Sequence, residues 1–216
     1  MEILRIGKSL FMPKVILQEK FEQENITSLV FYLSLISAIF AVVSISVFDI
    51  EDISKVLGVT SIDLSLYKAY KIFMLLGSGI LAFFTPTIIT LINTIFNFLL
   101  LWILQTSISF KKLFIIGMYA YVPLLIDVLV RIFIEFIVSD PVFQSPARIF
   151  FFLPDSDNLI IKGLSTITLF TIWSIVIYSI GVSMEVPKNK QKRAILVLVI
   201  TNVLIIFTTT FIDQHN

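Results

Sequence analysis

Three charged side chains interrupt an apolar stretch in the middle of the sequence, LLIDVLVRIFIEF at 124–136. Asp127, Arg131 and Glu135 are spaced by four residues, so on a helix they lie on one face, one turn above another. Ionisable groups inside a membrane segment are default candidates for a proton relay or a substrate site. The alternative is a structural cluster in which Arg131 neutralises Asp127 near the outer end of the helix. We favour the structural cluster, because the other apolar segments contribute no charge.

Neutral polar and small residues mark three of the other apolar segments. We expect Asn93, Asn97 and Asn202 to bridge helices, a contribution of about 0.6 kcal/mol each in a measured bundle; in a transporter the same residues would line a path. Small residues at helical spacing let helix backbones approach closely, and the first segment carries such a stripe: Ser34, Ser37, Ala38, Ala41 and Ser44. The stripe is expected to be an internal packing face, or else a surface that meets a partner protein.

The sequence carries few residues that could do catalysis. It has no cysteine and one histidine, His215, which we expect to be a solvated residue. No glycine-rich phosphate loop and no paired-histidine zinc motif is present. The GSG tripeptide at 77–79 lacks the flanking pattern of a serine nucleophile. We therefore expect no enzyme activity, no catalytic residue, no metal and no cofactor.

The elements that must hold these residues are membrane helices. The 216 residues are 57% hydrophobic and 14% charged, and the mean hydropathy is +0.99. Soluble domains carry about 25% charged residues, so the composition is typical of an integral membrane protein whose first partners are membrane lipids. The net charge of +1 argues against a nucleic-acid partner, which would need a basic face.

The fold class that we predict is all-α, a polytopic bundle of five transmembrane helices. A crossing needs about 20 apolar residues, and the predicted spans are about 26–48, 72–108, 112–138, 162–184 and 194–212. The first run is too long for the apolar core of a signal peptide, so we expect it to be retained. The second run is long for one crossing. It is interpreted as one helix kinked near 77–86, and two short spans are the alternative.

The distribution of basic residues favours five spans. With one span at 72–108 and a cytoplasmic N-terminus, ten Lys and Arg residues lie inside and five outside. Two short spans would place KNKQKR at 188–193 opposite the basic N-terminus, against the positive-inside rule. We therefore expect the N-terminus to be cytoplasmic and the C-terminus external. The basic loop then lies in the cytoplasm and consists of Lys188, Lys190, Lys192 and Arg193.

The chain divides into a segment at 1–25 and a transmembrane domain at 26–213. Apolar residues alternate with charges in the first segment, which suits a helix on the cytoplasmic surface, interrupted at Pro13. An ordinary solvated leader is the alternative.

Two stretches resemble the Yip family, the Ypt/Rab-interacting multi-span membrane proteins. SFKKLFIIGMYAYVPLLIDVL at 109–129 is similar to the entry into the family's third span, and its matching positions are Phe110, Tyr119, Ala120, Tyr121 and Pro123. LFTIWSIVIYSIGVSM at 169–184 resembles the fourth span, with Phe170, Trp173 and Gly181. FMPKVILQEK at 11–20 looks like the lead-in of bacterial members.

The resemblance implies five spans, a cytoplasmic N-terminus and an external C-terminus, and no catalytic residues. It implies a short, prokaryotic-type member in the plasma membrane, without the long N-terminal region of eukaryotic members, so Rab binding is not expected. The expected function is that of a non-enzymatic accessory or scaffold protein for another membrane complex, or of a protein in membrane organisation. The alternative is a small transporter or channel that uses the Asp127, Arg131 and Glu135 ladder.

Overall fold

The computed structural model describes residues 2–23, 26–47, 63–106, 108–138, 145–150, 152 and 158–215. Within these residues the chain is helical with no strand, apart from one isolated bridge between Arg148 and Thr168. The all-α prediction is thus confirmed for the described part of the chain. The helices are α1 Glu2–Ser9, α2 Pro13–Gln23, α3 Thr27–Val47, α5 Leu64–Ile103, α6 Phe110–Ala120, α7 Val122–Val138, α8 Leu159–Ser165, α9 Leu169–Glu185 and α10 Lys188–His215.

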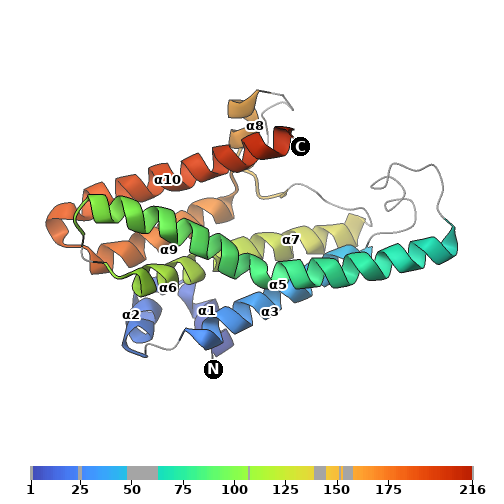
Figure 1. The fold of residues 1–216 in the computed structure, drawn as a ribbon, viewed down its shortest axis with the longest axis horizontal. Coiled ribbons are helices and arrows are strands. Elements are labelled where there is room, and N and C mark those ends of the chain that lie inside the picture. Colours follow the sequence, from blue (N-terminus) through green and yellow to red (C-terminus); the bar gives the residue numbers. More distant parts are fainter. Residues whose placement is uncertain are drawn as a thin grey trace.

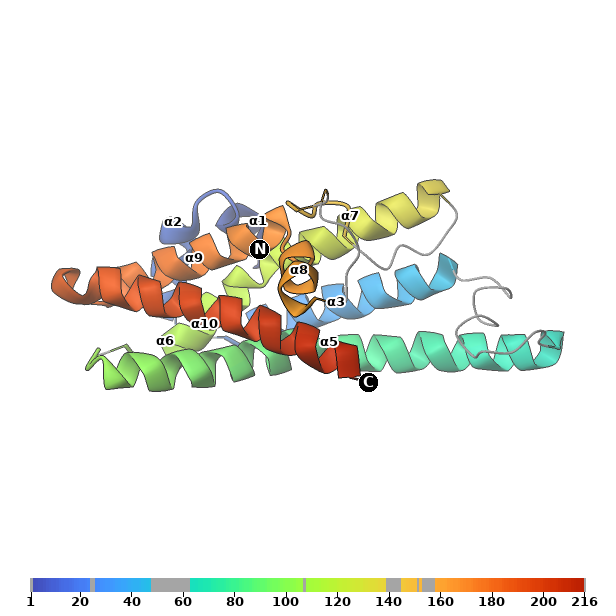
Figure 2. The same cartoon turned by 90° about the horizontal axis from the view of Figure 1, so that it is seen from above.

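The longest helix, α5, runs beside α3 along the bundle (Figures 1 and 2). The two are antiparallel: the Phe31 ring lies 6.4 Å from that of Phe83, and Lys71 Nζ donates to Ser46 O at the opposite end of α3. With 40 residues, α5 extends about 60 Å. It continues through Pro86 as a single helix and begins eight residues before the predicted span at 72–108.

Two other predicted spans are divided in the structure. The segment predicted at 112–138 forms α6 and α7, separated at Tyr121. Pro123 explains the break, because proline has no N–H to donate and its ring crowds the preceding turn. Of the segment predicted at 162–184, the first residues belong to α8, and α9 begins at Leu169. Thr168 caps α9 there, since its hydroxyl accepts a hydrogen bond from the Thr171 N–H.

The helices have the surface of a membrane protein. Four helical stretches in the described residues are long and apolar enough to cross a bilayer: Thr27–Val47, Ser65–Ile103, Phe110–Val138 and Lys188–Thr208. The fifth apolar helix, α9, is shorter at 17 residues. Large apolar side chains such as Phe73 and Leu81 are 75% and 72% exposed on α5. Lipid in place of water removes the penalty for such exposure.

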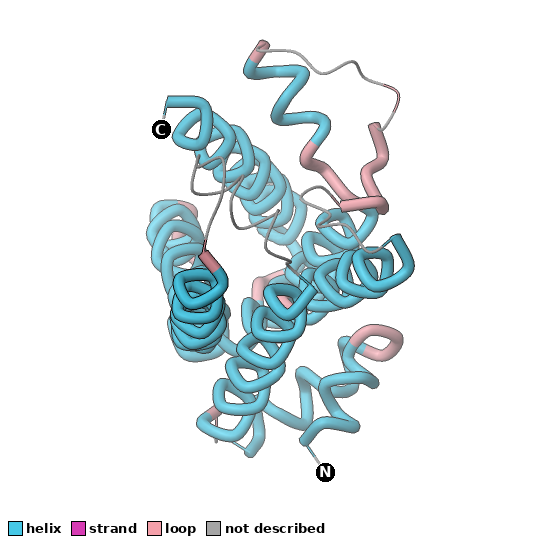
Figure 3. The backbone as a smooth tube through the Cα atoms, turned by 90° about the vertical axis from the view of Figure 1, so that its right-hand side faces the viewer, coloured by secondary structure: helices cyan, strands magenta, loops and turns pink. Residues whose placement is uncertain are grey.

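The core lies where α6 passes between α5, α9 and α2, and its largest fully buried side chains include Leu17, Leu113, Ile116, Tyr119 and Ile177. The helices α1 and α2 form a hairpin against one side of the bundle, and α8 lies on another side, next to α10 (Figures 1 and 3). The hairpin turns at residues 10–12, and Pro13 is the first residue of α2.

Candidate functional site

A row of polar side chains faces the interior of the bundle from α5. Thr90, Thr94 and Asn97 are 3%, 0% and 0% exposed, and their spacing of four and three residues places them on one face of the helix. Tyr178 of α9 lies against them, with its hydroxyl close to the side chains of Asn97 and Thr94. We call Thr90, Asn93, Thr94, Asn97 and Tyr178 the interior polar cluster.

The interior polar cluster borders a small cavity. Its volume is about 30 Å³, and its walls come from α5, α6, α7, α9 and α10, including Asn93, Gly117, Ser174, Tyr178 and Asn202. A water needs about 10–15 Å³ of such space and two or more polar partners. The cavity therefore has room for one or two waters and is too small for an organic substrate.

Several atoms of the interior polar cluster have no hydrogen-bond partner in the protein. They are Asn93 Oδ1, Thr94 Oγ1, both amide atoms of Asn97, and the Tyr178 hydroxyl. An unpaired buried polar group costs about 1–3 kcal/mol. The cluster is therefore a concentration of buried polar groups in the interior of the bundle.

The three asparagines that we expect to bridge helices differ in their contacts. The Asn202 side chain donates to Leu198 O within its own helix, at 2.8 Å, whereas the Asn97 side chain of α5 lies next to the Tyr178 hydroxyl of α9. What the three asparagines share is proximity: Asn93 and Asn202 line one cavity, and Asn97 is one turn along α5 from Asn93. Bridging between helices therefore stays a prediction for these asparagines, and the Asn202 amide bonds within α10.

The charged ladder lies on α7, but its three members do not pair with one another. Across the described residues no ion pair joins Arg131 to Asp127 or to Glu135. Asp127 accepts from Ser145 Oγ, and the Glu135 carboxylate accepts from Ser44 Oγ of α3 at 2.8 Å. The expectation that Arg131 neutralises Asp127 is therefore wrong. A spacing of four residues permits contact on a helix, but the Asp127 and Glu135 carboxylates accept hydrogen bonds from serine hydroxyls of other segments instead.

The small-residue stripe of α3 faces the interior at most of its positions. Ser34 and Ser37 are 2% and 8% exposed, Ala38 and Ala41 are half-buried, and Ser44 reaches α7 through Glu135. The interpretation as an internal packing face fits these burials. The two buried serines are not accessible to a partner protein.

The basic residues at 188–193 are helical rather than a loop. They form the first turns of α10, which begins at Lys188 directly after Pro187, a residue type that often stands at helix starts. Lys190 Nζ donates to Gln105 O at 2.7 Å and ties α10 to the end of α5. Gln105 turns the chain there with a left-handed φ of 53°.

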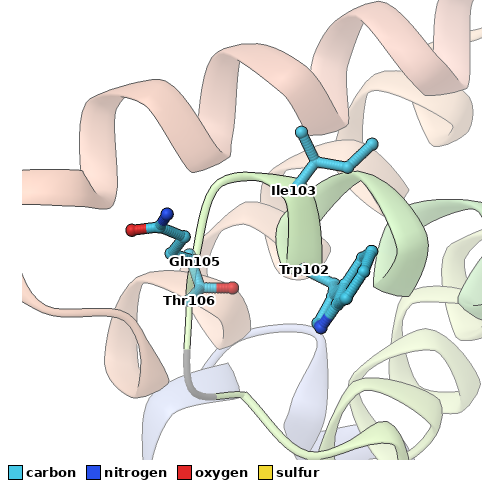
Figure 4. A pocket seen from close by; sticks show the side chains of 4 residues that line it. All are labelled: Trp102, Ile103, Gln105 and Thr106. Carbon is cyan, nitrogen blue, oxygen red and sulfur yellow. The ribbon is translucent and has the colours of Figure 1, made fainter.

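A hollow at this end of α5 offers no binding chemistry. It is lined by Trp102, Ile103, Gln105 and Thr106, and Figure 4 shows that Trp102, Ile103 and Gln105 point in different directions. Binding sites need polar groups that converge. The Trp102 side chain, 69% exposed, instead suits the aromatic belt at a membrane interface.

Metal chemistry has no support in the described residues, which hold no group of three or more His, Asp or Glu side chains able to share an ion.

The family comparison bears on these residues directly. The sequence matches the Yip1 domain over residues 8–212. The chain belongs to the Yip1 domain family. This confirms the predicted family and makes the chain a multi-pass membrane protein of a family that is generally non-enzymatic. No curated protein and no solved structure matches the chain.

Some of the residues that carry the resemblance to the Yip family lie at the joint between α9, α6 and the N-terminal hairpin. Gly181 packs against Ile116 and Leu17, and the Trp173 ring lies edge-on to Phe11, with centroids 6.1 Å apart. Tyr119 and Ala120 are buried in α6, while Tyr121 and Pro123 form its break with α7. Phe110 contacts Phe98, and Phe170 is half-buried on α9. Gly181 and Trp173 thus contribute to the joint that holds the N-terminal hairpin.

Two features of this joint escaped sequence reasoning. Lys20 pairs with Glu2 at 2.8 Å, and Lys112 of α6 pairs with Glu185 of α9 at 2.7 Å. The second pair joins residues 73 positions apart. The one signal available was the position of these charges at the ends of apolar stretches.

Proposed function

We propose that this Yip1-domain protein is a non-enzymatic accessory or scaffold protein that binds another membrane protein in the plasma membrane of a prokaryote. The observation that carries the proposal is a groove on the N-terminal hairpin. The groove has a volume of about 700 Å³ and is lined by Leu4, Arg5, Lys8, Phe11, Met12, Val15, Ile16 and Glu19.

The hairpin is fixed to the bundle on one side. Leu17 is fully buried, and Ile6 and Ile16 are 5% and 4% exposed. The Lys20–Glu2 pair joins α2 to α1, with Lys20 only 3% exposed. A segment held in this way presents its outer face in a defined orientation.

The outer face of the hairpin is apolar and exposed. Phe11 is 78% exposed, Leu4 69% and Met12 60%, with charged residues at the rim of the groove. An exposed apolar patch with a polar rim is typical of a protein–protein contact. A membrane-protein partner fits best, because the groove lies on the side of a bundle whose other faces meet lipid.

Five crossings with a cytoplasmic N-terminus place this groove at the cytoplasmic side. Support for five comes from the four long apolar helices together with α9, whose 17 residues extend about 25 Å. Tilt and local thinning accommodate a span of that length. Support for the orientation is the excess of Lys and Arg at 1–25, 111–112 and 188–193.

A small transporter or channel is the second candidate, and the interior polar cluster favours it. Its unpaired atoms resemble the polar lining of a path. The cavity of about 30 Å³ admits water but no solute larger than a small ion. Reconstitution into vesicles with ion-selective dyes separates the two candidates, because only a transporter gives a protein-dependent flux.

Affinity purification from native membranes in mild detergent tests the scaffold. We expect a membrane-protein partner in fixed ratio with the wild type, depleted at least tenfold by the double change Phe11→Ala and Met12→Ala. The control is Phe73→Ala, which removes an equally exposed ring from α5 (75% against 78%) and should retain the partner. A solitary wild-type protein, or equal recovery from the groove variant, contradicts the proposal.

A further inference from the structure

A polar pocket, separate from the groove on the N-terminal hairpin, lies at the N-terminal end of α9. Its volume is about 290 Å³, and it is formed by α7, the segment at 145–150, α8 and the start of α9. Three charged side chains, Asp127, Arg148 and Lys162, line it. The remaining walls are hydroxyl residues, namely Ser145, Ser165, Thr166, Thr168 and Thr171.

A chain of hydrogen bonds fixes the position of Arg148 in this pocket. Asp127 accepts from Ser145 Oγ, which in turn accepts from the Ala147 N–H. Leu169 N then donates to Ala147 O at 3.0 Å, and Ile149 N donates to Ile167 O at 3.0 Å. These bonds place Arg148 opposite Thr168, the cap of α9. Asp127 is thus a positioning residue for the segment that carries Arg148.

The two cations of the pocket have no anionic partner. No ion pair in the described part of the chain involves Arg148 or Lys162, and both are half-buried. The hydroxyls of Ser165 and Thr166 already donate to Lys162 O and Gly163 O. The charged donors left for a ligand are therefore the Arg148 guanidinium and the Lys162 ammonium. Partly buried cations without a counter-charge are unfavourable, which points to an anion.

We propose that this pocket binds a phosphate group. The planar guanidinium fork pairs with two phosphate oxygens, and a lysine adds a point charge. Two cations and the Asp127 carboxylate leave one net positive charge, which matches a phosphodiester monoanion such as a phospholipid headgroup.

The depth of the pocket suits a headgroup. The opposite end of α9 carries the Lys112–Glu185 ion pair, and α9 has 17 residues, so the two polar ends are about 25 Å apart. The hydrocarbon core of a bilayer is about 30 Å thick. An ion pair at one interface therefore puts the pocket close to the other, where lipid phosphates lie. Free inorganic phosphate has the same chemistry and is the second source to test.

The experiment uses the full chain purified in dodecyl maltoside. Thermal unfolding and native mass spectrometry are followed with dioleoyl-phosphatidylglycerol against dioleoylglycerol, and with sodium phosphate against sodium chloride at equal ionic strength. We expect phosphatidylglycerol to stabilise the wild type and dioleoylglycerol not to. Stabilisation by phosphatidylglycerol alone assigns a lipid headgroup, and stabilisation by millimolar phosphate as well assigns the free ion. No stabilisation by either overturns the proposal.

Substitutions connect the effect to the pocket. R148Q with K162Q should weaken binding about tenfold or more. The control is K192Q with R193Q, which removes the same number of positive charges from the exposed start of α10 and should bind as the wild type does.

Asp127→Asn keeps an acceptor for Ser145 and removes the negative charge, so it should tighten binding about threefold or more. A folding defect would not raise affinity, so this variant keeps the test decisive if R148Q with K162Q does not fold. Unchanged binding in R148Q with K162Q, or weaker binding in Asp127→Asn, overturns the proposal.

Discussion

Gly181 lets α9 approach α6 and α2 more closely than a side chain would allow. A Cβ atom at this position would lie 2.6 Å from Ile116 Cγ2 and 3.0 Å from Leu17 Cδ1. We expect Gly181→Ala to lower the free energy of unfolding by about 1–3 kcal/mol, because the neighbouring helices must move apart. The measurement is thermal or denaturant unfolding in detergent micelles.

The control for this prediction is Gly77→Ala in α5. A Cβ at position 77 meets nothing within 4 Å, and alanine favours a helix interior by about 1 kcal/mol. This change should therefore be neutral or stabilising. Equal losses at positions 181 and 77 would contradict a packing role for Gly181.

Residue identity was easier to predict from the sequence than residue contacts. Asn93, Asn97 and Asn202 stand out in the sequence as polar residues in apolar segments, and in the structure Asn93 and Asn202 line one cavity and Asn97 is buried next to it. The partners of the charged ladder did not follow from spacing, because Asp127 bonds to Ser145 across a loop and Glu135 to Ser44, 91 positions away. Contacts of this kind depend on how helices pack, and a single sequence carries no direct signal for them.

At the scale of elements, the N-terminal hairpin depends on a buried ion pair. Lys20 and Glu2 are 3% and 10% exposed, and loss of the Glu2 charge would leave the Lys20 ammonium without its carboxylate partner. We expect Glu2→Gln to destabilise the docked hairpin by about 3 kcal/mol. Hydrogen exchange should then rise across residues 2–23 while α6 and α9 stay protected.

The matched change is Glu19→Gln on the same hairpin. Glu19 lies 3.7 Å from Arg5, but its side chain is 49% exposed, and exposed pairs contribute little. Exchange in Glu19→Gln should therefore equal that of the wild type. An undisturbed hairpin in Glu2→Gln would mean that apolar packing around Leu17 alone holds it.

The ends of the helices were harder to predict from the sequence than their approximate positions. The apolar runs overlap the four stretches of the described residues that are long enough to cross a bilayer, but hydropathy does not register a break inside a run. The Tyr121 break follows from Pro123, and the start of α9 follows from the Thr168 capping box. The proline and the capping threonines are visible in the sequence, but each feature consists of only one or two residues. Whether such a short feature ends a helix depends on the tertiary contacts that the neighbouring helices α6 and α8 make.

At the scale of the whole molecule, the distribution of basic residues is not explained by helix stability. The first six residues of α10 include Lys188, Lys190, Lys192 and Arg193. Cations at a helix N-terminus oppose the helix dipole and cost a few tenths of a kcal/mol each. Their position is better explained by membrane orientation, because basic residues resist translocation.

Single cysteines report the side of the membrane, since the natural chain has none. Gln18→Cys, Asn189→Cys and Ser65→Cys alter exposed, uncharged positions on α2, α10 and α5. With five crossings and a cytoplasmic N-terminus, a membrane-impermeant maleimide should label position 65 in intact cells, and positions 18 and 189 only after permeabilisation. Two short crossings in place of α5 would put positions 18 and 189 on opposite sides. Labelling of position 189 but not position 18 in intact cells would therefore overturn the five-span topology, and with it the cytoplasmic location of the basic start of α10.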